Sequence, residues 1–240
     1  MNKILSNYIK YKFIFNNNIK HSSYLYQKVF RSIYGYTQNV TKKDKQVYQY
    51  YRKGVIDDLP YLRPGKNCLI LSLNTEHKLI NFFNTGKSTT HNFKERGEYS
   101  IDYTIDKIEI NDIEIINCLE NYITNYNIIS VNSKINKLIN ELDLIINEKD
   151  YFSKYKKANK DNLINKLNFI ISIDWFIKCK NSSELIIDFY NKINKVKEIF
   201  NIVKDVSNNP EIYTEDIDEV NTITSENKAS KDNIDNISSK

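Results

Sequence analysis

The sequence predicts a mostly α-helical fold: a helical bundle, with short strands possible between residues 68 and 110 and a disordered C-terminal tail. Between residues 111 and 204, apolar residues recur at the spacing of one helix face, in segments joined by short polar turns. Antiparallel helices with short connections pack as bundles. From 205 to 240 the chain is polar and acidic without periodicity, a composition that does not form a packed core.

Residues 1–21 have the composition of a mitochondrial targeting segment. No acidic residue occurs from Met1 to Lys43, and residues 1–21 are basic and contain hydroxyl side chains, as such segments do. Four apolar residues lie at helical spacing: Ile4, Tyr8, Tyr11 and Ile14. We therefore expect import into the mitochondrial matrix; a basic N-terminal helix of the mature domain is the alternative. Lysines interrupt the apolar core that a secretory signal needs, and no run reaches the roughly 18 apolar residues of a transmembrane segment.

Residues 22–60 are expected to form a pair of basic, tyrosine-rich helices. The first, near 23–36, has an apolar stripe of Leu25, Val29 and Ile33, which is typical of an amphipathic helix. The second, near 42–59, begins with a capping box formed by Thr41 and Asp44 and ends at a proline. Three of the four arginines of the chain fall in or just after this pair: Arg31, Arg52 and Arg63.

Residues 61–110 form a connecting segment whose structure the sequence leaves open. The apolar run at 68–73 fits either a buried strand or the start of a helix that continues to residue 83. The polar stretch that follows is expected to be a loop. Ile108 and Ile110 alternate with polar residues, so that a short strand is possible near 101–110.

The helical bundle is assigned to residues 111–204, with the acidic tail at 205–240. Four segments have apolar residues on one helical face, at 111–123, 132–148, 160–178 and 182–204. Asn111 or Asp112 is expected to cap the first of them.

No catalytic, metal or cofactor site is expected. Gly86-Lys87-Ser88-Thr89 matches the end of a phosphate-binding loop, but Asn81 occupies the position where that motif requires its first glycine. The histidines and cysteines show no metal-ligand spacing, and no serine lies in a glycine-rich elbow. Three widely spaced cysteines favour a reducing compartment. The sequence therefore predicts a protein that is not an enzyme.

The segment Leu25-Tyr26-Gln27-Lys28-Val29-Phe30-Arg31 resembles the signature of the LYR-motif (complex I LYR-like) mitochondrial accessory and assembly proteins. In that family, Leu-Tyr-Arg on the first helix precedes two apolar residues and a second arginine; here Gln27 replaces the motif arginine. The resemblance covers about residues 22–60. It implies binding of acyl carrier protein between the two helices, with Leu25, Tyr26, Arg31, Arg52 and Lys53 as the partner-binding residues.

These patterns predict a non-catalytic accessory or assembly protein that binds protein partners of a mitochondrial complex through the basic helix pair, with acyl carrier protein as the partner that the resemblance implies. The alternative is an RNA-contacting or ribosomal component. Lysines and arginines interleaved with tyrosines can combine phosphate contacts with base stacking. Both functions would use the same surface.

Overall fold

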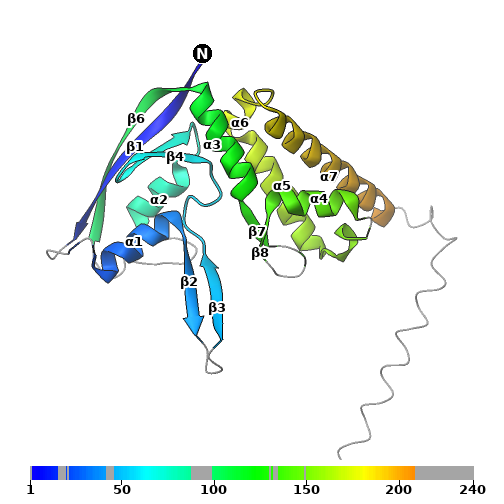
Figure 1. The fold of residues 1–240 in the computed structure, drawn as a ribbon, viewed down its shortest axis with the longest axis horizontal. Coiled ribbons are helices and arrows are strands. Elements are labelled where there is room, and N and C mark those ends of the chain that lie inside the picture. The colour runs from blue at the N-terminus through cyan, green and yellow to red at the C-terminus, as the bar shows by residue number, and fades with distance from the viewer. Residues whose placement is uncertain are drawn as a thin grey trace, which may run out of the picture. The chain divides into compact units, whose positions relative to one another are not determined.

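The structure, a computed structural model, contains a four-stranded antiparallel sheet in its N-terminal half (Figure 1), so the fold is α/β and the predicted helical bundle is wrong. The strand order in this sheet is β4-β5-β1-β6. The strands are β1 (Lys3–Phe15), β4 (Tyr61–Gly65), β5 (Cys68–Ser72) and β6 (Tyr99–Asn111). The structure describes residues 2–15, 20, 22–41, 46–87, 99–129, 131, 135–148 and 150–208.

Strand β1 is made from the residues assigned to the targeting segment, and it lies between β5 and β6. The helix expected there is wrong. From Asn7 to Phe13 every second side chain is buried, which is the period of a strand. Near its start, Ile4 and Ser6 are buried from the opposite face. Apolar side chains lie on both faces of the strand, and four of them, Ile4, Tyr8, Tyr11 and Ile14, happen to match helical spacing although Ile14 is exposed.

Helix α1 (Tyr24–Tyr34) confirms the first helix of the predicted pair. The hydroxyl of Ser23 accepts a hydrogen bond from the backbone N–H of Tyr26 (3.3 Å), as an N-cap residue does. The second helix is wrong. Its place is taken by the antiparallel hairpin of β2 (Tyr36–Thr41) and β3 (Val47–Arg52), followed by turns. Asp44 of the predicted capping box lies outside the described residues.

Helix α2 (His77–Thr85) and helix α1 cover one face of the sheet. The ring of Phe83 from α2 lies 5.3 Å from that of Tyr11, and Tyr26 from α1 lies 5.4 Å from Phe13. Of the two structures that the sequence left open for the run at 68–73, the strand is confirmed as β5. The helix that follows, α2, is a separate element. The Gly86-to-Thr89 match begins at the C-terminal end of α2, and its last two residues lie outside the described ranges.

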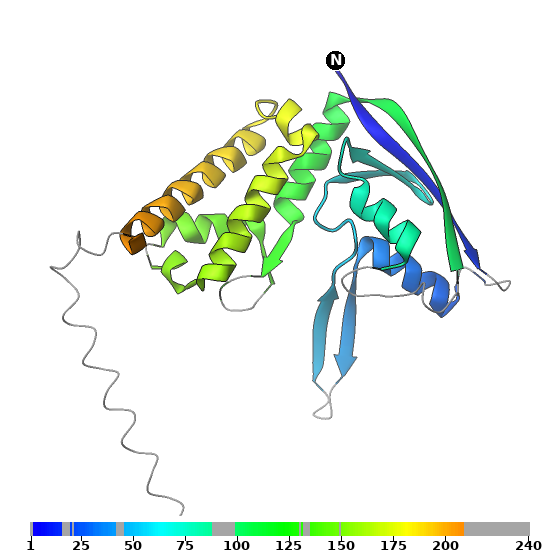
Figure 2. The same cartoon turned by 180° about the vertical axis from the view of Figure 1, so that it is seen from behind.

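Helices predominate after β6, as expected (Figures 1 and 2). They are α3 (Asp112–Asn125), α4 (Leu138–Asn147), α5 (Lys157–Ser172), α6 (Asp174–Lys178) and α7 (Glu184–Asn208), with a small hairpin of β7 (Asn127–Ile129) and β8 (Ile135–Lys137) after α3. Asn111 caps α3 through a hydrogen bond from the N–H of Ile113 (3.1 Å). The chain divides into two units, Met1–Val196 and Lys197–Lys240. The predicted disordered tail lies outside the described residues from 209 onward.

A fully buried tryptophan joins the second face of the sheet to the helices. Nε1 of Trp175 in α6 donates to the hydroxyl of Ser6 in β1 (3.0 Å), and its backbone N–H donates to the hydroxyl of Ser72 in β5 (3.1 Å). The two serines thus satisfy donors that would otherwise be buried without partners. Within the described residues, no helix is long and apolar enough to cross a membrane.

Candidate functional site

Two of the predicted site residues, Arg31 and Arg52, are brought together around Tyr36. The guanidinium carbon of Arg31 lies 5.1 Å from the centre of the Tyr36 ring. Tyr36 is in turn the register partner of Arg52 in the hairpin. Both arginines are exposed. The structure therefore groups them through a helix and a β-ribbon, not through two helices.

The other predicted site residues lie elsewhere. Tyr26 is only 7% exposed and packs against Phe13, so it is a core residue. Leu25 is half-buried on α1. Lys53 forms an ion pair with Asp58, at the base of the hairpin.

One face of the hairpin, which we call the ribbon face, collects aromatic, amide and guanidinium groups. Directly opposed residues of an antiparallel pair point to the same face, and so does every second residue along a strand. Nε of Arg52 donates to Oε1 of Gln38 (3.2 Å), and its guanidinium lies 5.9 Å from the ring centre of Tyr50. The ribbon face consists of Tyr36, Gln38, Val40, Tyr48, Tyr50 and Arg52. Neither strand contains an acidic residue.

Two glycines fix where the ribbon leaves helix α1. Gly35, which follows the helix, has φ +69°, a left-handed conformation that favours glycine. Gly54, which follows β3, lies directly against the end of the helix. A Cβ atom on Gly54 would approach Ile33 O and Tyr34 C closer than 3.0 Å. The N–H groups of Val55 and Ile56 donate to Ser32 O (2.9 Å) and Ile33 O (3.2 Å), so the chain directly after this crossing is bonded to α1.

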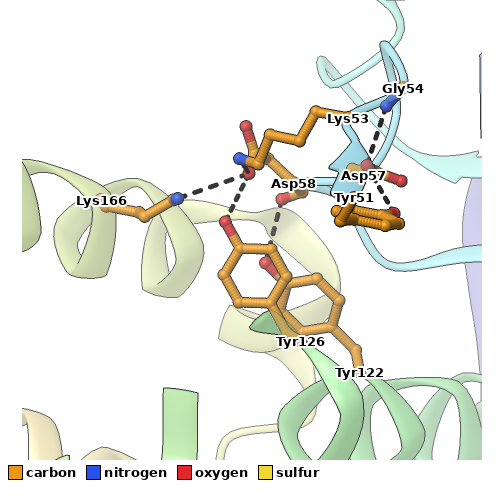
Figure 3. Close-up of polar contacts among 8 residues, drawn as sticks. All are labelled: Tyr51, Lys53, Gly54, Asp57, Asp58, Tyr122, Tyr126 and Lys166. Atoms are coloured by element: carbon orange, nitrogen blue, oxygen red, sulfur yellow. Dashed lines mark hydrogen bonds and ion pairs between the residues drawn. The ribbon is translucent and has the colours of Figure 1, made fainter. Parts of the chain in front are cut away.

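Asp57 holds the turn after the ribbon. Its Oδ2 accepts hydrogen bonds from the Tyr51 hydroxyl (2.7 Å) and from the Gly54 backbone N–H (2.8 Å), as Figure 3 shows. Burial raises the pKa of the Asp57 carboxyl above its usual value, and the two hydrogen bonds offset this only in part. This carboxylate therefore keeps Tyr51 and the glycine crossing in one arrangement.

Asp58 connects the same turn to two helices (Figure 3). Its carboxylate pairs with Lys53, accepts a hydrogen bond from the hydroxyl of Tyr126, the residue after α3, and lies 3.5 Å from Nζ of Lys166 in α5. Its backbone carbonyl accepts from the Tyr122 hydroxyl (3.0 Å). Burial alone would raise the pKa of Asp58, but the lysine and tyrosine contacts outweigh burial and lower it to about 2. Two lysines thus share one carboxylate.

A cleft of about 430 Å³ lies between the turn, the start of β4 and helix α3. Its apolar and aromatic lining comes from Tyr51, Pro60, Tyr61, Leu62, Tyr122 and Tyr126. Its polar lining comes from Lys53, Asp57 and Cys118, and from exposed α3 and β7 residues, namely Glu114, Asn117, Asn121, Asn125 and Asn127. The rings of Tyr122 and Tyr126 are stacked, with centroids 4.8 Å apart.

Arg63 of β4 extends the cationic surface from the ribbon toward the cleft. Its guanidinium lies 4.9 Å from the Phe30 ring centre and 4.7 Å from that of Tyr34. The Tyr34 ring contacts Tyr61, which lines the cleft, at 5.9 Å. Arg63 is not among the site residues predicted from the sequence, although arginine is scarce in this lysine-rich chain. Nothing in the sequence indicated the cleft, because its lining comes from two segments, 51–62 and 114–127, that lie far apart in the chain.

Among the described residues, no three histidine, cysteine or carboxylate groups lie close enough to hold a metal ion. Burial raises the pKa of Cys118, the thiol at the cleft, to about 12, which keeps it protonated and unreactive at neutral pH. The arrangement can bind a ligand by stacking, hydrogen bonds and charge.

Comparison with known proteins gives no relative: no family model matches the chain, and neither a curated protein nor a solved structure is significantly similar to it.

Proposed function

We propose that this chain is a non-catalytic protein that binds single-stranded RNA with its ribbon face. The observation that carries the proposal is the grouping of Tyr36, Tyr48 and Tyr50 with Arg31 and Arg52 on one side of the hairpin. Aromatic rings provide stacking surfaces for unpaired bases, and guanidinium groups contact phosphate.

Charge favours a polyanionic ligand at this end of the chain. Residues 1–56 contain eleven lysines and arginines against one acidic residue, Asp44. Each cation–π contact also holds an arginine in place before the ligand arrives, which reduces the side-chain entropy lost on binding. Stacking contributes about 1–3 kcal/mol per base, and phosphate contacts add a term that weakens with salt.

A protein partner is less well supported by this geometry. The LYR-motif resemblance implies an acyl chain held between two helices, and the second of these helices is replaced by a hairpin. Binding of acyl carrier protein, service in a mitochondrial complex and location in the matrix therefore stay predictions. The variants below test the protein partner as well, because an acidic carrier would also need Arg31 and Arg52.

The test is binding of a fluorescein-labelled 12-nucleotide RNA to the full chain, followed by fluorescence anisotropy at several salt concentrations. Arg52→Glu should weaken binding at least tenfold and reduce the salt dependence. The matched control, Lys195→Glu, makes the same charge change on exposed α7 and should have little effect.

Tyr50→Ala should weaken binding of base-containing RNA more than binding of abasic RNA. Equal weakening by Arg52→Glu and Lys195→Glu would contradict a specific ribbon face. Binding of acyl carrier protein, with no binding of RNA, would replace this proposal by the accessory-protein prediction.

A further inference from the structure

We propose that the cleft beside the ribbon holds one unstacked base of the bound RNA strand. This inference rests on the proposed function and assigns a second, distinct role to the cleft residues. Three properties of the cleft carry it: its aromatic lining, its unused side-chain amides and its charge.

The size and lining of the cleft suit a flat ring. Its volume of about 430 Å³ falls in the range of pockets that hold small ligands. Tyr51 and Tyr61 bring aromatic rings from the hairpin and from β4, and the buried, mutually stacked rings of Tyr122 in α3 and Tyr126, which follows α3, form part of the wall. Bases splayed out of a single strand are commonly held by stacking on such side chains.

The amides supply a hydrogen-bonding edge. Asn117 and Asn121 are one helical turn apart on α3, so both point to the cleft from the same helix face. Within the described part of the chain, neither side-chain amide has a hydrogen-bond partner. An asparagine amide presents one donor and one acceptor side by side and can pair with the edge of a base.

Charge separates the cleft from the ribbon face. Lys53, the only cation among the cleft-lining residues, is already paired with Asp58, whereas Asp57 and Glu114 bring carboxyl groups. An acidic side chain of a protein ligand would meet these carboxyls. An uncharged base would not be repelled by them. The phosphates of the RNA strand would remain on the side of Arg52 and Arg63.

The two surfaces are close enough for one strand to reach both. Adjacent strand residues point to opposite faces and lie about 3.4 Å apart along the strand. Arg52 belongs to the ribbon face and its neighbour Tyr51 lines the cleft. Around the other side, Arg63 is connected to the cleft through the rings of Tyr34 and Tyr61.

The test uses the full chain and a 12-nucleotide RNA that carries one 4-thiouridine, crosslinked by near-ultraviolet light and mapped by mass spectrometry. Crosslinks are expected on the segments that contain Tyr61 and Tyr122 as well as on the ribbon. The double change Asn117→Ala, Asn121→Ala should weaken the binding of base-containing RNA by roughly tenfold. Binding of abasic RNA should be unaffected. Asn140→Ala, an exposed asparagine of α4 outside the cleft, is the matched control.

Alanine favours helix formation more than asparagine does, so the fold should tolerate these changes. If Arg52→Glu abolishes binding while the double asparagine variant binds like wild type, the cleft inference fails and the ribbon proposal stands. Crosslinks confined to the ribbon would have the same meaning. If the wild-type chain binds no RNA, both proposals fail.

Discussion

The crossing of Gly54 over the end of helix α1 gives a sharp prediction about stability. In Gly54→Ala the new methyl group would lie closer than 3.0 Å to Ile33 O, Tyr34 C and Gly35 N. All three are backbone atoms, which cannot rotate away as a side chain can. The hairpin base must therefore move away from the helix and lose the bonds that Val55 and Ile56 donate to it.

The expected cost follows from this geometry. Overpacking a well-packed site typically costs 1–3 kcal/mol, and each lost backbone hydrogen bond adds about 1 kcal/mol. We therefore expect Gly54→Ala to lower the free energy of unfolding by roughly 3 kcal/mol or more. Because the same movement displaces Tyr51 and Arg52, RNA binding should weaken as well.

Urea denaturation followed by tryptophan fluorescence measures this cost, since the single tryptophan, Trp175, is fully buried. Gly65→Ala is the matched control, because a Cβ atom at Gly65 meets nothing within 4 Å. That variant should unfold close to the wild-type midpoint or slightly above it. Equal midpoints for Gly54→Ala and Gly65→Ala would refute the reasoning.

Three further predictions concern the strand, the turn and the helices. Deleting residues 2–21 removes β1 from between β5 and β6, so the product should be insoluble or lack a cooperative transition by circular dichroism; a folded, soluble product would contradict a structural role for this segment. The pKa of Asp58 is lowered from 3.8 to about 2, so its ionic contacts stabilise the fold above pH 4 and lose that effect as the pH falls toward 2. The difference in unfolding free energy between wild type and Asp58→Asn should therefore shrink by about 2 kcal/mol over that window. A difference that stays constant with pH would contradict this prediction. Tyr155→Phe removes one of the hydrogen-bond donors to the fully buried carboxylate of Glu141, which also accepts from Tyr151 (3.0 Å) and Asn136 (2.8 Å). The change should lower the free energy of unfolding by about 1.5–3 kcal/mol, measured by urea denaturation. Tyr24→Phe, at a residue 76% exposed, should leave this free energy almost unchanged.

The sequence predicted α1 because its apolar stripe of Leu25, Val29 and Ile33 has the spacing of a helix face. For β1 the sequence suggested a helix, which is wrong. In this strand the buried face changes between Ser6 and Asn7. A strand covered by Trp175 on one face and by α1 and α2 on the other has no single period. Such a pattern can match helical spacing over a short window.

The hairpin at 36–52 was missed for a related reason. Tyr48 and Tyr51 lie three residues apart and suggest one helical face, but in the structure they point to opposite faces of the ribbon. Tyrosines on both faces leave no simple alternation to identify a strand. The strand preference of tyrosine, valine and threonine was the signal that could have decided the case.

The site could be predicted only in part. Arg31 and Arg52 were identified through the LYR-motif resemblance, and both lie beside Tyr36 in the structure. The cleft depends on the approach of α3 to the turn at Asp58, which is a long-range contact that local spacing does not contain.

The position of β1 in the sheet also determines when the protein can fold during synthesis. Lys3 pairs with Asn111, so this strand cannot complete its pairing until β6 has left the ribosome. At about 5–20 residues per second, the wait is several seconds. During that time an unpaired apolar strand could associate with other nascent chains. Lys10 and Lys12, exposed within the strand, are suited to oppose such association by charge repulsion.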